Sequence, residues 1–294
     1  MKRFKGAGVA IVTPFKSDSS IDFAALGRVI NHVIKGGINY IVALGTTGES
    51  VTLTKDEKQA VISFVTETND GRVPLIIGIG GNNTQEVVNS IRHTNLNGID
   101  GILSVAPYYN KPTQRGIFQH FKTISTWSPV PVIMYNVPGR TGCNISAETC
   151  LELAHNCENI TGVKEASGDL TQIMKIIKGK PENFGVISGD DMLSIPVVAA
   201  GGIGVISVLG NAFPAVCSEI LSHALKNNFK SAREIHFKYL EMIELLFTEG
   251  NPAGVKAMLS TMNICQNYLR LPLVPVSRTT LTRIQKAIEE VSKA

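Results

Sequence analysis

Short apolar runs alternate along the chain with longer segments of helical period. Each run is four or five residues long and almost uniformly apolar. Such runs are typical of parallel strands that are covered on both faces, whereas a strand with one wet face alternates between polar and apolar residues. We therefore predict eight buried strands, at Gly8–Val12, Tyr40–Leu44, Leu75–Gly78, Gly101–Val105, Val132–Tyr135, Thr161–Lys164, Gly185–Ser188 and Gly204–Ser207.

The spacing between these runs is roughly 20–35 residues, the length of a strand followed by its return helix. Helix starts are marked by Thr54 with Glu57, which form a capping box, and by Asn83 and Asp169 as N-caps. Eight such units close most naturally into a (β/α)8 TIM barrel, an α/β fold. An open doubly wound sheet is the alternative, because strand order cannot be read from the sequence.

After Asn211 the strand pattern stops and only amphipathic helical segments remain. The first, "FPAVCSEILSHALKN", can serve as the eighth barrel helix. The later ones, among them "SAREIHFKYLEMIELLF" as one helix, are expected to form a C-terminal helical extension. We therefore predict a barrel over residues 1–225 and an extension over residues 226–294.

Composition excludes several classes of protein. The 294 residues carry a net charge of only +4 without a run of five like charges, which gives no support to nucleic-acid or membrane-surface binding. No apolar segment approaches a membrane span, and the N-terminal run is too short for a signal peptide. Five cysteines without a C-x-x-C pair fit neither a disulfide framework nor a zinc site, so we expect reduced thiols and a cytoplasmic location.

Polar, hydroxyl-bearing and glycine-rich residues gather at the C-terminal ends of the predicted strands. These ends are where the catalytic residues of such barrels lie. The segments are "GTTGES" (45–50), "APYYNKP" (106–112), "YNVPGRTG" (135–142), "GVKEASGD" (162–169) and "SGDD" (188–191). The two acids of "GDD" suggest metal carboxylates but are better interpreted as a helix N-cap.

Lys164 ends an apolar strand, where burial should exclude a charge. A lysine partly withdrawn from water gives up its proton more readily, and the free amine condenses with a ketone or aldehyde to form a Schiff base. The alternative is a lysine that reaches solvent or pairs with Glu165. Because neighbours on a strand face opposite ways, these two residues should not share an environment.

Three other strand ends could support this chemistry. The phenol of Tyr135 could carry protons, although it could also be a half-buried core tyrosine. Thr46 and Thr47 could hold a carboxylate through hydroxyl and N–H groups, or form a plain glycine turn. Arg140 could clamp a second carboxylate, or be an ordinary surface arginine.

These motifs together resemble the family of 4-hydroxy-tetrahydrodipicolinate (dihydrodipicolinate) synthases, within the pyruvate-dependent class I aldolases that include N-acetylneuraminate lyase. The resemblance runs nearly end to end. "GTTGE" with a strand-end lysine marks the superfamily, whereas "PYYNKP" with "NVPGRT" points to the synthase branch.

The resemblance implies a lyase that condenses pyruvate with L-aspartate 4-semialdehyde, early in lysine and diaminopimelate biosynthesis, without a metal or organic cofactor. Lys164 would form the imine with pyruvate. The implied assembly is a homotetramer, a dimer of dimers. The implied roles are a proton relay (Tyr135, Thr46, Tyr109, the last reaching a neighbouring subunit), carboxylate binding (Thr47, Arg140) and pocket lining (the carbonyl of Ile206).

Regulation is where the chain departs from the family pattern. Lysine-inhibited members bind lysine at positions that match Val51, Lys55, Lys58, Asn82, Glu86 and Tyr108. Lys55 and Lys58 replace histidines of the inhibited bacterial type, and two added cations would repel the ammonium groups of lysine. We therefore predict weak or absent feedback inhibition.

Two other functions remain open at this stage. A sister aldolase or dehydratase acting on a sugar acid such as N-acetylneuraminate would keep Lys164 and Tyr135 but would not need Arg140 or the tyrosine pair. A barrel that binds a keto acid as a sensor, without turnover, belongs to a different class. The intact lysine, tyrosine and threonine set disfavours a sensor.

Overall fold

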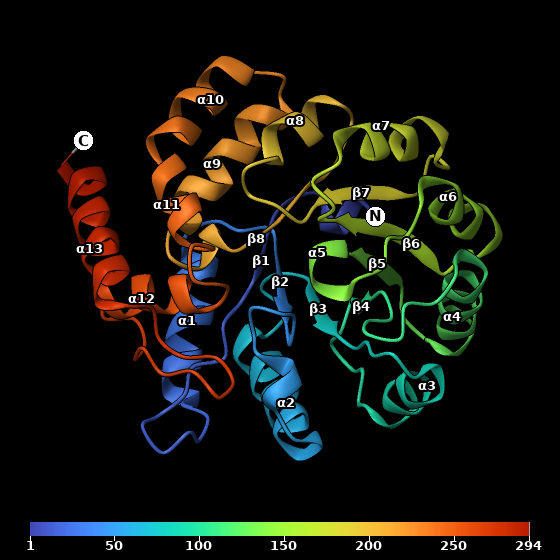
Figure 1. Cartoon of the computed structure of the whole chain (residues 1–294), viewed down its shortest axis with the longest axis horizontal. Coiled ribbons are helices and arrows are strands. Elements are labelled where there is room, and N and C mark those ends of the chain that lie inside the picture. The colour runs from blue at the N-terminus through green and yellow to red at the C-terminus, as the bar shows by residue number, and fades with distance from the viewer. Residues whose placement is uncertain (294) are drawn as a thin grey trace.

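A computed structural model describes residues 1–293 and contains a closed barrel of eight parallel strands in sequence order, in which β8 returns to pair with β1 (Figure 1). This arrangement confirms the predicted TIM barrel and excludes the open sheet. The strands are β1 (Gly6–Ala10), β2 (Tyr40–Ala43), β3 (Leu75–Gly78), β4 (Gly101–Val105), β5 (Val132–Asn136), β6 (Ile160–Glu165), β7 (Gly185–Ser188) and β8 (Gly204–Ser207).

Helices follow the strands and form an outer ring. They are α1 (Phe23–Lys35), α2 (Lys55–Asn69), α3 (Thr84–His93), α4 (Gln114–Trp127), α5 (Pro138–Thr141), α6 (Ala147–Asn156), α7 (Leu170–Gly179), α8 (Ser194–Ala199) and α9 (Pro214–Leu225), with short 3-10 helices η1 (Lys2–Phe4), η2 (Ser50–Thr52) and η3 (Leu209–Asn211). The capping box of Thr54 with Glu57 is confirmed, as are the N-caps Asn83 and Asp169. Local signals therefore placed these helix starts correctly.

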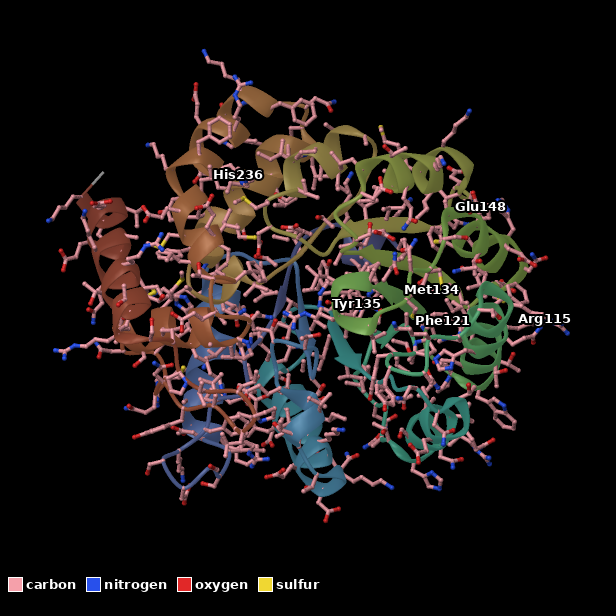
Figure 2. All side chains as sticks on the ribbon, viewed as in Figure 1. Arg115, Phe121, Met134, Tyr135, Glu148 and His236 are labelled. Atoms are coloured by element: carbon pink, nitrogen blue, oxygen red, sulfur yellow. The ribbon has the colours of Figure 1, made fainter. Side chains whose placement is uncertain are left out.

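Alternate side chains of each strand fill the inside of the barrel or pack under the helices. Tyr135 belongs to the inner cluster with Ile133 and Ile206, whereas Met134 packs outward with Phe121 of α4. Figure 2 shows Met134 on the α4 side and Tyr135 nearer the centre. Both faces of β5 are therefore buried, which explains its uniformly apolar sequence.

The first strand begins two residues earlier than predicted, at Gly6 rather than Gly8, and ends at Ala10. Gly6 is already paired with Gly204 of β8. Beyond the strand, the N–H of Val12 donates to the side chain of Asn211 (3.1 Å) instead of to a neighbouring strand. Apolar character alone does not distinguish a strand from the buried loop that follows it.

In the part of the chain that the structure describes, four helices follow the barrel: α10 (Phe229–Lys238), α11 (Leu240–Leu245), α12 (Ala253–Thr261) and α13 (Arg278–Lys293), which lie on one side near α1 and α9 (Figure 1). The single helix predicted over α10 and α11 is wrong, because the helix breaks at Tyr239, whose ring packs on Phe213 (5.2 Å between centroids). None of the helices in residues 1–293 is long and apolar enough to cross a bilayer. The division at residue 225, where α9 ends, stays a prediction.

A fully buried ion pair attaches the extension to the barrel. Lys256 of α12 donates to the carboxylate of Glu49, in the loop after β2, at 2.5 Å, and neither side chain is exposed to solvent. The same amine donates to the carbonyl of Tyr268 (2.9 Å), and the N–H of Arg270 donates to Glu49 (3.0 Å). Arg270 also pairs with Glu57 of α2. The extension is therefore fixed to the loop that carries "GTTGES".

Replacing Lys256 with methionine should destabilise the fold by about 3–5 kcal/mol, because Glu49 then stays buried without a cation. Urea unfolding followed by circular dichroism measures this loss. Lys286→Met is the matched control, because its partner Glu290 lies 3.6 Å away on the exposed surface. The control should change stability by less than about 1 kcal/mol. Equal losses in the two variants would contradict the role given to the buried pair.

Candidate active site

Lys164 and Tyr135 lie side by side inside the barrel, at the C-terminal ends of β6 and β5. The strand register places them directly opposite each other. Their exposed fractions are only 6% and 7%. The amine of Lys164 lies 4.3 Å from the centroid of the Tyr135 ring, a cation–π distance. Two residues that are 29 positions apart thus bring an amine and a phenol into one buried space.

The surroundings of Lys164 leave its amine free for chemistry. Among residues 1–293 it forms no ion pair with an acid. Glu165 points to the outer face, where it accepts from Asn136 and Gln172, so the prediction that Lys164 and Glu165 occupy different environments is confirmed.

Gly189, just after β7, approaches the Lys164 side chain closely. A methyl group added at Gly189 would lie 3.0 Å from Cε of Lys164 and 2.7 Å from Cβ of Ala166. Both separations are shorter than van der Waals contact between carbon atoms. The glycine therefore leaves the space in which the lysine stem lies.

The loop after β2 presents Thr46 and Thr47 differently. Thr46 is half-buried, whereas Thr47 is 2% exposed and its hydroxyl accepts a hydrogen bond from Asn251 (3.0 Å). Glu49 adopts a left-handed backbone with φ of 51°, and its side chain is the buried partner of Lys256. The C-terminal extension thus fixes this loop at two points.

Ile206 is 1% exposed and belongs to the inner cluster with Tyr135. The segment after it is held by Asp191, whose carboxylate accepts from Ser207 Oγ (2.5 Å) and from the N–H groups of Val208 and Leu209 (2.8 and 3.1 Å). Burial raises the pKa of Asp191 above its ordinary value. The end of β8 therefore has a fixed position relative to the end of β7.

The interpretation of "GDD" as a helix N-cap is wrong. The next helix, α8, begins only at Ser194 and has no side-chain cap. Asp191 turns inward to β8, and Asp190 accepts from the N–H of Met192 (2.9 Å). Asp190 thus makes a local bond within the loop, whereas the donors to Asp191 come from the next strand end, which a sequence pattern cannot reveal.

Arg140 and Tyr109 lie at the rim rather than inside. Arg140 is exposed on α5, directly after β5. Tyr109 is 88% exposed and has a left-handed backbone with φ of 73°, and its N–H donates to the carbonyl of Thr141 (3.2 Å). The loop is therefore attached to α5 while the Tyr109 ring points away from the interior of its own chain.

The six positions that match a lysine-binding site lie partly together. Asn82 donates through its side chain to the carbonyl of Tyr108 (3.1 Å), while Val51 is 81% exposed. Burial is the main cause that lowers the pKa of Lys58, and the positive charge of Lys55 lowers this pKa further. Glu86, in the first turn of α3, is exposed. The two lysines are thus close enough to affect each other electrostatically.

Sequence reasoning missed Lys256 and Asn251, which hold the threonine loop from the extension. The sequence contained a sign of the buried position of Lys256, because this lysine interrupts the otherwise apolar segment "PAGVKAMLS". The five cysteines are free thiols. Within the described residues, no group of three or more histidine, cysteine, aspartate or glutamate side chains is arranged to hold a metal.

Comparisons with known proteins agree over the whole chain. The model of the Dihydrodipicolinate synthetase family matches residues 3–291. A 4-hydroxy-tetrahydrodipicolinate synthase of Flavobacterium psychrophilum is 48% identical over 293 residues, which cover 100% of both chains. The dihydrodipicolinate synthase structure from Thermotoga maritima superposes with a TM-score of 0.96 at 39% identity, covering 99% of this chain and 100% of that one.

A second structure, the chloride-inhibited dihydrodipicolinate synthase from Acinetobacter baumannii complexed with pyruvate, superposes with a TM-score of 0.95 at 36% identity. It covers 98% of this chain and 99% of that one. Sequence and structure therefore agree from one end of the chain to the other. The chain belongs to the Dihydrodipicolinate synthetase family of enzymes.

Proposed function

We propose that the chain condenses pyruvate with L-aspartate 4-semialdehyde to give 4-hydroxy-tetrahydrodipicolinate and water, the reaction for which its relatives are named. The observation that carries this proposal is the amine of Lys164 lying over the Tyr135 ring, with both side chains almost fully buried at the barrel mouth. A lysine amine that is buried in such a place and paired with no acid among the described residues is suited to Schiff-base formation.

In the first half of the reaction, Nζ of Lys164 attacks the keto carbon of pyruvate. The keto oxygen leaves as water once it has received protons, and the phenol of Tyr135, whose ring lies under the amine, supplies them. The resulting iminium withdraws electrons, so that the pyruvate methyl group loses a proton and an enamine forms.

In the second half, the enamine carbon bonds to the aldehyde carbon of the semialdehyde, and the aldehyde oxygen takes up a proton to become the hydroxyl. The amino group of the semialdehyde then attacks the imine carbon. This attack closes the ring and releases the amine of Lys164. One water leaves per product, and the lysine is regenerated.

Other residues have supporting roles in this proposal. Thr46 and Tyr109 complete the proton relay with Tyr135, Thr47 binds the pyruvate carboxylate through its N–H, and the carbonyl of Ile206 lines the pocket. Arg140, exposed at the rim, binds the semialdehyde carboxylate.

We also propose the assembly that these roles require. Because Tyr109 is 88% exposed in its own chain, we place its phenol in the site of a neighbouring copy. The assembly is a homotetramer built as a dimer of dimers, in the cytoplasm. The pyruvate complex of the Acinetobacter relative supports the choice of the first substrate.

Reduction with borohydride in the presence of pyruvate should attach a carboxyethyl group to Lys164 and abolish activity. Peptide mass spectrometry locates the label, and Lys164→Arg should remain unlabelled because a guanidinium stays protonated. Turnover with L-aspartate 4-semialdehyde should far exceed turnover with N-acetylneuraminate. Label on another lysine would overturn the mechanism, and faster turnover of the sugar acid would identify a sister aldolase instead.

Gly189→Ala should slow imine formation by about tenfold, because the new methyl group displaces the Lys164 stem, and overpacking costs about 1–3 kcal/mol. The rate of reductive labelling with pyruvate measures this effect. Gly27→Ala is the control, because its added methyl would contact only Phe64 at 3.6 Å, within helix α1. An unchanged labelling rate in Gly189→Ala would show that the close approach is not needed.

Feedback inhibition by L-lysine should be weak or absent, because Lys55 and Lys58 place two cations where other members have histidines. Initial rates with increasing L-lysine test this expectation. The double variant Lys55→His with Lys58→His should become more sensitive. Near-complete inhibition of the natural sequence at sub-millimolar lysine would refute the prediction.

A further inference from the structure

A cluster of buried polar side chains lies on the outer face of the barrel wall, directly behind Lys164 and Tyr135. Asn136 and Glu165 are the next residues along β5 and β6, and they therefore point to the opposite face. Their exposed fractions are 0% and 1%. The mechanism above uses neither side chain, although each is joined by one peptide bond to a residue that the mechanism does use.

Glu165 is a buried carboxylate held entirely by neutral donors. Asn136 donates to it at 2.6 Å, Gln172 at 3.0 Å and the hydroxyl of Ser167 at 2.5 Å. Within residues 1–293, no cation pairs with it. Burial raises its pKa, while these hydrogen bonds act in the opposite direction. Because both carboxyl oxygens accept hydrogen bonds, the side chain of Glu165 is held in one position relative to its three donors.

Asn136 has a fixed orientation. Its carbonyl oxygen accepts from the N–H of Ile145 (2.9 Å), and its amide also donates to the side chain of Asn144 (2.7 Å). Rotation of the amide would break these bonds together with the bond to Glu165. The donor that faces Glu165 is therefore held in place from the loop before α6.

The pairing of β5 with β6 contains an irregularity a few residues before this bond. Val132 is opposite Ile160, but the next residue, Ile133, is opposite Gly162, so Thr161 is an extra residue in β6. Backbone hydrogen bonds alone can form in more than one register beyond a bulge. A shift of one residue would turn Lys164 from the inside of the barrel to the outside.

We propose that Asn136 and Glu165 are positioning residues for the reaction. Their hydrogen bond forms only in the register that places Tyr135 opposite Lys164, and it thereby keeps the amine over the ring. The inference depends on the proposed function in one respect, which is that Lys164 is the residue that forms the imine.

Asn136→Asp removes the donor and places two carboxylates against each other. Reductive labelling of Lys164 with pyruvate should slow by about tenfold or more. A factor of this size corresponds to the usual interaction energy between two residues in direct contact, here Asn136 and Glu165. Adding Glu165→Gln reverses the direction of the bond, because the new amide can donate to the new carboxylate. This double variant should recover most of the labelling rate, a rescue that general destabilisation would not give.

Asn69→Asp is the matched control, because Asn69 is 2% exposed and donates to the carbonyl of Val73 (2.7 Å), at the end of α2. It should lower the melting temperature without slowing the labelling. If Asn136→Asp does not fold, the milder Asn136→Ser replaces it, with the same expected direction.

Three results overturn the inference. A folded Asn136 variant labelled at the natural rate removes the positioning role alone. Equal slowing in Asn69→Asp, or a folded double variant without recovery, assigns the effect to stability. Absence of label from Lys164 in the natural sequence overturns the proposed function together with this inference, and is thus distinguishable from the first two results.

Discussion

The site depends on closure of the barrel by the pairing of β8 with β1. Gly6 is opposite Gly204 there, and the backbones pass so closely that a side-chain carbon on Gly204 would overlap the carbonyl oxygen of Gly6. Closure leaves no sheet edge to protect and brings all eight C-terminal strand ends to one rim. Lys164 and Tyr135 already face each other on neighbouring strands, and closure surrounds them with the other strand ends, among them that of β8 with Ile206.

Three buried carboxylates stand behind the rim, and each fixes a segment next to a residue of the proposed site. Glu49 holds the threonine loop after β2 and is paired with Lys256. Glu165 holds the end of β6 beside Lys164 and is paired with Asn136. Asp191 holds the end of β8 beside Ile206 through Ser207 and two N–H groups.

This arrangement separates chemistry from support. The inner face carries an amine, a phenol and apolar side chains, while the charged groups that orient them lie behind the wall or in the loops, away from the amine. A carboxylate placed next to Lys164 would favour its charged form and oppose nucleophilic attack. Locating the acids behind the wall gives rigidity to the mouth of the barrel without adding that charge to the pocket.

The sequence by itself determined the eight strands, the helix starts at Thr54, Asn83 and Asp169, and the unusual position of Lys164. These features depend on the local pattern of apolar residues and on helix-capping residues, both of which can be read from neighbouring positions in the sequence. The tertiary structure alone decided the partners of Glu49 and Asp191, 207 and 16 residues away. The first pair forms only when the C-terminal extension packs against the loop after β2, and the second only when β7 and β8 lie side by side. No local pattern carries that information.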